Sequence, residues 1–181
     1  MGNISKPEPA MLFIGMLYAD PAVCHHIQPV LEKEFGDAAL VSREMKWQHS
    51  EYYRDELGWP LLRQFVFYKK FIDQGDLAAI KIRTNELENI HSEDNKRRIN
   101  LDPGYLTLSK LVLASTKNYA HRLYLGQGIY GEITLYFQKG AYRPHLFTYR
   151  DYREKNCIDL FMHARAVFRD LLSEKASSFL T

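Results

Sequence analysis

Residues 122–137 read Arg-Leu-Tyr-Leu-Gly-Gln-Gly-Ile-Tyr-Gly-Glu-Ile-Thr-Leu-Tyr-Phe. Two runs rich in apolar and aromatic residues flank the Gly-Gln-Gly segment at 126–128. A three-residue connection with glycines that accept positive φ is typical of a β-hairpin. The predicted cross-strand pairs, counted outward from the turn, are Leu125–Ile129, Tyr124–Tyr130, Leu123–Gly131 and Arg122–Glu132.

The hairpin is predicted to have one apolar and one polar face, because side chains alternate along a strand. The predicted buried face contains Leu123, Leu125, Ile129, Ile133, Leu135 and Phe137. The predicted polar face contains Arg122, Tyr124, Tyr130, Glu132, Thr134 and Tyr136. Burial on one face is typical of an antiparallel sheet that packs against helices.

Further strands and helices are predicted on both sides of the hairpin from apolar runs, periodicity and breaker residues. The predicted strands are 11–18, 38–47, 61–72 and 142–147, and the predicted helices are 21–35, 76–91 and 154–172. Asp102-Pro103-Gly104 predicts a turn. The apolar segment 106–116 is compatible with either a strand or a helix.

This order of elements predicts an α+β fold. We expect a two-layer domain with a largely antiparallel sheet and about three helices, as a variation on the ferredoxin-like topology. Residues 1–10 contain Pro7 and Pro9 and are predicted to form a flexible N-terminal tail. Residues 11–181 are predicted to form a single domain, since the whole chain has only 181 residues.

Composition excludes several classes of protein. The formal charge of +2 carries no bias toward nucleic acids or membranes. The two cysteines, Cys24 and Cys157, form no CxxC pattern and suit a reducing, cytoplasmic compartment. The apolar run at 11–18 is too short to span a bilayer. We therefore expect a cytoplasmic protein without a membrane partner.

Common nucleotide-binding and hydrolase motifs are missing from the sequence. It contains no GxxxxGK[ST] phosphate loop, no GxGxxG, no GxSxG and no HExxH. The segment 115–118, Ser-Thr-Lys-Asn, is similar to the base-reading tetrapeptide of GTPases. Without a phosphate loop, nothing in the sequence would hold the phosphates and magnesium.

Residues of the kinds that occur in functional sites are concentrated in 97–152. The candidate acid–base or metal-ligating residues are His121, Glu132 and Asp102. The candidate ligand-binding residues are Lys81, Asn85, Asn100, Lys117, Arg122, Tyr130, Tyr149, Asp151 and Arg165. Each candidate also has a purely structural interpretation.

The position of each candidate residue in the sequence suggests a structural role as the alternative to a functional one. Arg122 opposite Glu132 predicts a cross-strand ion pair, and the alternative is an arginine oriented toward an anionic ligand. His121 at a strand start is compatible with a structural role, and Asp102 before a proline with a turn.

Arg165 lies in the apolar stripe of the last predicted helix, where an unpaired charge would be costly. It could extend past its neighbours to solvent, or pair with Asp102, Glu132 or Asp151. The third alternative is that it faces a pocket that holds a phosphate or carboxylate.

Several segments together resemble a known family. They are 99–105 (INLDPGY), 111–118 (LVLASTKN), 121–125 (HRLYL), 128–135 (GIYGEITL) and 148–152 (TYRDY). This combination resembles a prokaryotic family catalogued only as a domain of unknown function, numbered forty-four sixteen. Members are sometimes labelled GTP-binding protein, and this sequence supplies no physical basis for that label. Where the family tends to have proline, this chain has Arg150, so a rigid turn before Asp151 is not implied.

Three functional hypotheses remain open. The first is a protein that binds or acts on a small anionic or phosphorylated ligand in a polar pocket, with a nucleotide as one candidate. The second is an RNA-binding module in which Tyr124, Tyr130 and Tyr136 beside Arg122 stack on bases. The third is a non-catalytic protein-interaction domain with a large exposed apolar patch. The sequence does not specify an enzyme activity, a metal, a cofactor or an oligomeric state.

Overall fold

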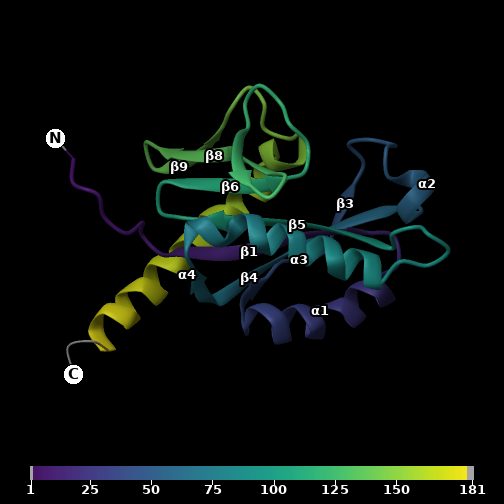
Figure 1. Cartoon of the computed structure of the whole chain (residues 1–181), viewed down its shortest axis with the longest axis horizontal. Helices are drawn as coiled ribbons and strands as arrows, with labels where there is room; N and C mark the ends of the chain where they lie inside the picture. The colour runs from purple at the N-terminus through teal and green to yellow at the C-terminus, as the bar shows by residue number, and fades with distance from the viewer. Residues whose placement is uncertain (1, 179–181) are drawn as a thin grey trace.

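The computed structural model describes residues 2–178 (Figure 1). Within that range, nine strands form one sheet. The strands are β1 (Ala10–Tyr18), β2 (Ala38–Val41), β3 (Met45–Trp47), β4 (Leu61–Ile72), β5 (Ile99–Leu106), β6 (Lys110–Ser115), β7 (Leu123–Gly126), β8 (Ile129–Gln138) and β9 (Ala141–Pro144). The helices are α1 (Pro21–Phe35), α2 (Arg54–Leu57), α3 (Leu77–Ile90) and α4 (Lys155–Ser178), with short 3₁₀ turns η1 (Gln74–Asp76) and η2 (Asp151–Arg153).

The strand order of the sheet is β2-β4-β1-β5-β6-β8-β7, with β3 paired to β4 and β9 paired to β8. Every paired neighbour is antiparallel. The succession β1-α1-β2-β4-α3-β5 is the β-α-β-β-α-β arrangement of ferredoxin-like folds. Strands β6 to β9 extend that unit beyond β5. The predicted α+β class with a largely antiparallel sheet is therefore confirmed.

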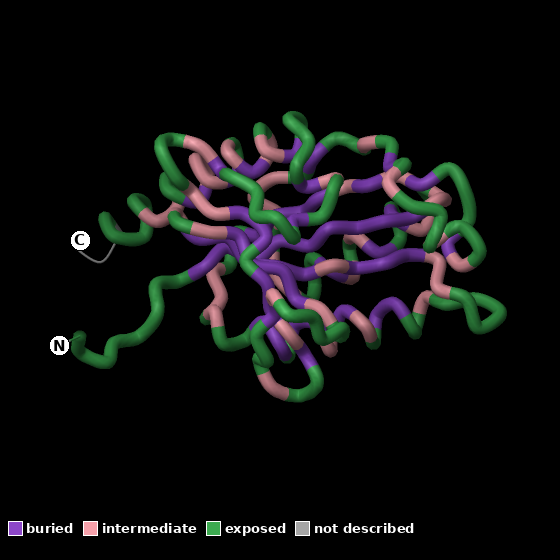
Figure 2. The backbone as a smooth tube through the Cα atoms, turned by 90° about the horizontal axis from the view of Figure 1, so that it is seen from above, coloured by how far each residue is buried: buried purple, intermediate pink, exposed green. Residues whose placement is uncertain are grey.

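Helices cover both faces of the sheet. Strand β1 contributes side chains to both interfaces, because alternate side chains of a strand point in opposite directions. Ile14 belongs to a buried cluster that includes Ile27 of α1 and Leu87 of α3. Phe13 belongs to a second cluster that includes Phe161 of α4. The expected two layers are the sheet with α1 and α3, and α4 adds a layer on the opposite face. Figure 2 shows the buried strands running through the middle of the molecule.

No helix within residues 2–178 has both the length and the apolar character needed to cross a bilayer.

Several predicted boundaries differ from the structure. The predicted strand over 38–47 is two short strands, β2 and β3, which both pair with β4. The ambiguous segment 106–116 contains the strand β6. The turn predicted at 102–104 is wrong, because these residues continue β5 without interruption.

The predicted hairpin is the β7–β8 pair. Tyr124 lies opposite Tyr130 as predicted, whereas Gly126, not Leu125, lies opposite Ile129. Gly126 and Gly128 have positive φ of 104° and 79°, the conformation for which glycine is suited. Arg122 lies just before β7 and still reaches Glu132.

The assignment of the hairpin's two faces is only partly correct. Ile129 and Leu135 are buried as predicted. Leu123, Leu125 and Ile133 are exposed, by 75%, 42% and 48%, whereas Arg122 and Glu132 are buried. The β6–β8 register shifts by one residue between Ile133 and Leu135, which interrupts the alternation. The Thr148 hydroxyl also donates to the Thr134 carbonyl at 2.5 Å, so a later segment packs against β8 at this residue.

The packing of α4 on the sheet can be tested at Phe161, which is fully buried and contacts the rings of Phe13, Phe65 and Phe67. We expect Phe161→Ala to lower the free energy of unfolding by about 3–5 kcal/mol, because it removes a large buried ring and leaves a cavity. The control Leu146→Ala, at a side chain that is 82% exposed, should change it by less than about 0.5 kcal/mol. Urea denaturation measures both, and equal small effects would contradict this packing.

Candidate functional site

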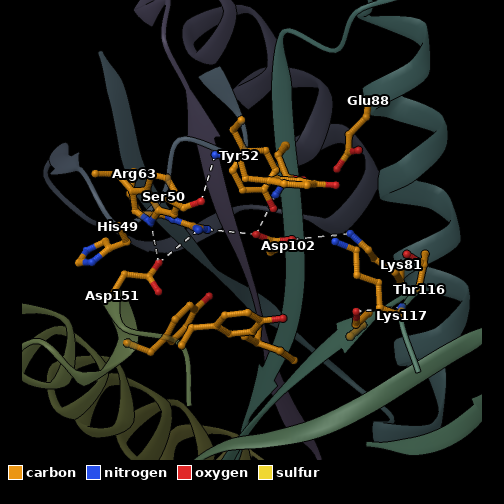
Figure 3. A pocket seen from close by; sticks show the side chains of 18 of the residues that line it. His49, Ser50, Tyr52, Arg63, Lys81, Glu88, Asp102, Thr116, Lys117 and Asp151 are labelled. Carbon is orange, nitrogen blue, oxygen red and sulfur yellow. Dashed lines mark hydrogen bonds and ion pairs between the residues drawn. The ribbon is translucent and has the colours of Figure 1, made fainter. Parts of the chain in front are cut away.

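A cavity opens where β5 and β6 diverge. Strand β5 begins at Ile99, but β6 pairs with it only from Gly104 to Leu106. Beyond that point β6 stays with β8, up to Ser115. The first half of β5 therefore lacks a strand neighbour on one side. A cavity of about 560 Å³ lies there, lined by residues of both strands, of α3 and of the segments 47–53 and 149–152 (Figure 3).

Side chains of α3 bond the open edge of β5. The Lys81 ammonium donates to the Leu101 carbonyl at 2.8 Å, and the Glu88 carboxylate accepts from the Leu101 N–H at 2.6 Å. Both side chains are buried. Pro103 faces the same edge as Leu101, because backbone groups alternate along a strand, and it has no N–H that needs a partner. This explains how an Asp-Pro-Gly segment remains extended.

Arg63 of β4 joins two carboxylates at the base of the cavity. Its guanidinium lies 3.2 Å from Asp102 of β5 and 3.2 Å from Asp151 of η2. To reach Asp102 the guanidinium crosses Gly15 of β1, where an added Cβ would lie only 2.9 Å from it. Asp151 also accepts from the Trp47 indole at 3.1 Å. Figure 3 shows Arg63 between the two carboxylates.

Asp102 is the most exposed of the carboxylates that line the cavity, with 28% of its side chain exposed. Its Oδ2 accepts from Arg63 and from the Asn100 amide, at 3.2 and 2.8 Å. Burial opposes its ionisation, but Lys81, Arg63 and these hydrogen bonds outweigh burial and hold the pKa of Asp102 below its ordinary value. Asp102 is therefore a charged acceptor at neutral pH and a weak base.

Arg97 connects α2, α3 and β5 at the side of the cavity. It binds both oxygens of Glu56 at 2.6 and 2.7 Å, and it donates to Glu88 at 2.9 Å and to Asn100 at 3.0 Å. Burial nevertheless raises the pKa of Glu88, against the opposing effects of Lys81, the Leu101 N–H and Arg97.

Glu132 forms part of the wall and is held from behind. The predicted ion pair with Arg122 is present, with 2.7 Å between Nε and Oε2. Arg122 also bonds Ser115, the Lys117 carbonyl and the Tyr149 hydroxyl, at 2.9, 2.8 and 2.5 Å. Burial, aided by Glu132, raises the pKa of Tyr149 to about 12. Arg122 therefore fixes the wall but does not line the cavity.

Two exposed cations, Lys117 and Arg150, also line the cavity. Among residues 2–178, no ion pair joins either of them to a carboxylate. The Lys117 ammonium lies 4.8 Å from the ring centre of Tyr52, which is itself 67% exposed. These residues place positive charge at the solvent side of the cavity.

Most of the candidates from the sequence meet at this cavity. The candidates that line it are Glu132, Asp102, Lys81, Asn85, Asn100, Lys117, Tyr149 and Asp151. The candidates that do not are His121, Arg122, Tyr130 and Arg165.

The candidates outside the cavity have local partners. His121 bonds Glu132 at 3.0 Å and stacks on Phe147, and the Tyr130 ring contacts Tyr124. Arg165 donates to the Leu108 carbonyl at 2.8 Å and lies over the Phe137 ring, so it pairs with none of the three carboxylates considered for it. No residue of α4 lines the cavity.

Several lining residues were not among the candidates from the sequence. They are Trp47, His49, Ser50, Tyr52, Tyr53, Arg63, Glu88, Asn89, Leu113, Ala114, Ser115 and Thr116. Arg97, Arg150 and Tyr152 also line the cavity, and they belong to the group of functional residue types recognised in 97–152 without an assigned role. Arg63 could have been identified from the sequence. In β4, alternation along the strand places it on the same side as the buried residues Leu61 and Phe65. Within residues 2–178, His, Cys, Asp and Glu side chains form no group of three suited to a metal ion.

The charged state of Asp102 gives a pH-dependent prediction. Because its pKa in the folded protein is lowered, its contribution to stability is complete above the ordinary value of 3.8 and is lost as the pH falls below it. We expect Asp102→Asn to lower the free energy of unfolding by about 1–3 kcal/mol at pH 7. The difference from the unmodified protein should shrink only below pH 3.8. Urea titrations across pH measure it, and a difference that already disappears near neutrality would contradict the assignment.

Comparison with known proteins identifies a family. Residues 8–168 match the family described as Domain of unknown function (DUF4416). No curated protein and no solved structure matches the chain. The matched range covers β1 to most of α4, and therefore every element that lines the cavity. The chain belongs to the DUF4416 family.

Proposed function

We propose that the protein binds a small anionic ligand in the cavity between β5 and β6, with phosphorylated metabolites and nucleotides as candidate ligands. The observation that carries this proposal is the pair of exposed cations, Lys117 and Arg150, that line the cavity and form no ion pair with any carboxylate of residues 2–178. A cation in that position can form a charge-assisted hydrogen bond with a phosphate or carboxylate.

The distribution of charge supports an anion near the solvent side. Arg63 is balanced by Asp102 and Asp151, and Arg97 by Glu56 and Glu88. These inner cations already have carboxylate partners. Positive charge that is still available lies at Lys117 and Arg150.

The size of the cavity supports a small molecule. Its volume of about 560 Å³ lies within the range of about 300–1,000 Å³ that is common for ligand pockets. Tyr52, Tyr53, Trp47 and Tyr149 give the lining an aromatic component. A ligand with a flat or apolar portion could pack against these rings while its anionic group meets the lysine and arginine.

The proposal is for binding, and it includes no catalytic step. A general base works best with a pKa near the operating pH, whereas the pKa of Asp102 is lowered. His121 contacts Glu132 from outside the cavity.

The two alternative functions receive less support. Arg122 is only 9% exposed and bonds through all three of its nitrogens, so it is not available to RNA beside Tyr124. Exposed apolar side chains do occur at Leu123, Leu146 and Phe147, but nothing in the structure indicates what would cover them.

Binding can be tested by thermal shift with inorganic phosphate, glycerol 3-phosphate, ribose 5-phosphate and AMP. A ligand at a hundredfold excess over its Kd should stabilise the protein by about 2.7 kcal/mol. For a chain of this size, that corresponds to a rise in Tm of roughly 5–10 °C.

The double variant Lys117→Ala/Arg150→Ala should bind at least about tenfold more weakly, because both available cations are removed. A matched control, Lys33→Ala/Arg43→Ala, removes an exposed lysine and arginine that do not line the cavity. The control should bind as the unmodified protein does. The proposal fails if no anion raises Tm, or if both double variants respond alike.

A further inference from the structure

The structure points to a second requirement of the ligand at the inner end of the cavity: we infer that it carries a hydroxyl group that bridges Lys81 and Asp102. This inference rests on the proposed function, because it names the chemical class of the anion that would occupy the same cavity. The class is a small anion with a hydroxyl group, such as a phosphorylated polyol or a hydroxycarboxylate.

Lys81 retains hydrogen-bonding capacity at the cavity. Its ammonium has three donors, and the Leu101 carbonyl takes one of them at 2.8 Å. The carboxylate oxygen Oδ1 of Asp102 lies 3.8 Å from Nζ, which is too far for a direct hydrogen bond. Lys81 lines the cavity, so its remaining donors can meet a ligand there. Figure 3 shows the two side chains facing each other across this gap.

Asp102 retains an acceptor at the same place. Its Oδ2 is occupied by Arg63 and Asn100, whereas no hydrogen bond to Oδ1 is formed by any residue from 2 to 178. Asp102 keeps 28% of its side chain exposed although its neighbours Leu101 and Pro103 are buried. The cavity therefore contains a charged acceptor, Oδ1 of Asp102, beside a charged donor, Nζ of Lys81.

The spacing selects the bridging group. An oxygen about 2.8 Å from each atom fits between a donor and an acceptor that are 3.8 Å apart. That oxygen must accept from Lys81 and donate to Asp102. A hydroxyl group does both, whereas an ionised phosphate or carboxylate oxygen cannot donate and would be repelled by Asp102.

The remaining surroundings fix the orientation of the ligand. The available cations, Lys117 and Arg150, are exposed, whereas Lys81 is buried. The anionic group should therefore lie toward solvent and the hydroxyl group toward β5. Amides of Asn85 and Asn89 also line the cavity and can bond further hydroxyl groups.

The test compares ligands that differ only in hydroxyl groups. The phosphate arm pairs glycerol 3-phosphate with propyl phosphate, and ribitol 5-phosphate with pentyl phosphate. The carboxylate arm pairs 3-hydroxybutyrate with butyrate. We expect at least one hydroxylated member to bind roughly tenfold to a hundredfold more tightly than its match by calorimetry, as for a hydrogen bond to charged groups.

Variants test whether the side chains of Asp102 and Lys81 cause the preference for the hydroxylated ligand. Asp102→Ala and Lys81→Met should each reduce the preference for the hydroxylated member to about onefold. The preference is a ratio measured within one variant, so a change in overall affinity that follows from the lost Arg63 or Leu101 contacts does not affect it. Binding of propyl phosphate to each variant shows that the cavity is still formed. Asp37→Ala is the matched control, because Asp37 and Lys69 form a pair with the same 3.8 Å spacing on the exposed surface. It should keep the full preference.

The outcomes separate the two proposals. If both members of every pair bind equally well, the hydroxyl requirement is wrong and anion binding stands. If no member of either arm binds at millimolar concentration, both proposals are wrong. A preference that survives Asp102→Ala or Lys81→Met also overturns the bridge, since the hydroxyl group would then be recognised elsewhere.

Discussion

The open edge of β5 is the feature on which the cavity depends. A buried strand that loses its neighbour leaves peptide groups without partners, and each such group costs about 1–3 kcal/mol. Here α3 supplies the partners, because Lys81 and Glu88 bond the carbonyl and the N–H of Leu101. Pro103 further reduces the number of backbone groups that need a hydrogen-bond partner, because it has no N–H. The sheet can therefore open between β5 and β6 without unsatisfied backbone at Leu101.

The same edge explains why so many charges are buried in one place. A lysine that caps a carbonyl and a glutamate that caps an N–H bring both signs into the interior, where unpaired charges are costly. The neighbouring ion pairs of Arg63 and Arg97 complete a network in which each inner charge has an opposite neighbour. Toward solvent, the cavity-lining cations Lys117 and Arg150 form no ion pair within the described range 2–178. The structural network and the proposed contacts of Lys117 and Arg150 with the anionic group are thus distinct parts of one cavity.

The sequence predicts the elements whose ends carry local signals. The bounds of α1 agree because Pro21 begins the helix and Gly36 follows its end. The bounds of β4 agree because Pro60 directly precedes the strand and its sequence is rich in Phe and Val. The turn at Asp102 was wrong because only the tertiary contact with α3 keeps this segment extended. The faces of the hairpin were only partly correct because a one-residue register shift on β8 has no local signature.

The candidate site was only partly predictable for the same reason. The charged residues near the hairpin were identified from the sequence. The cavity itself forms where two strands diverge, and the periodicity of a sequence does not indicate such a divergence. Arg63 was missed because it lies within an apolar run, although its place in the buried alternation distinguishes it. Arg165 was chosen for its apolar surroundings, and its local contacts with Leu108 and Phe137 satisfy it instead.

Residue-resolved hydrogen exchange of the Leu101 amide tests this account most directly. We expect this N–H, which belongs to no strand ladder on that side, to be as protected as the amides of β1. We also expect Glu88→Ala to abolish the protection at Leu101 while β1 remains protected. Rapid exchange of Leu101 in the unmodified protein, or protection that persists without Glu88, would contradict it.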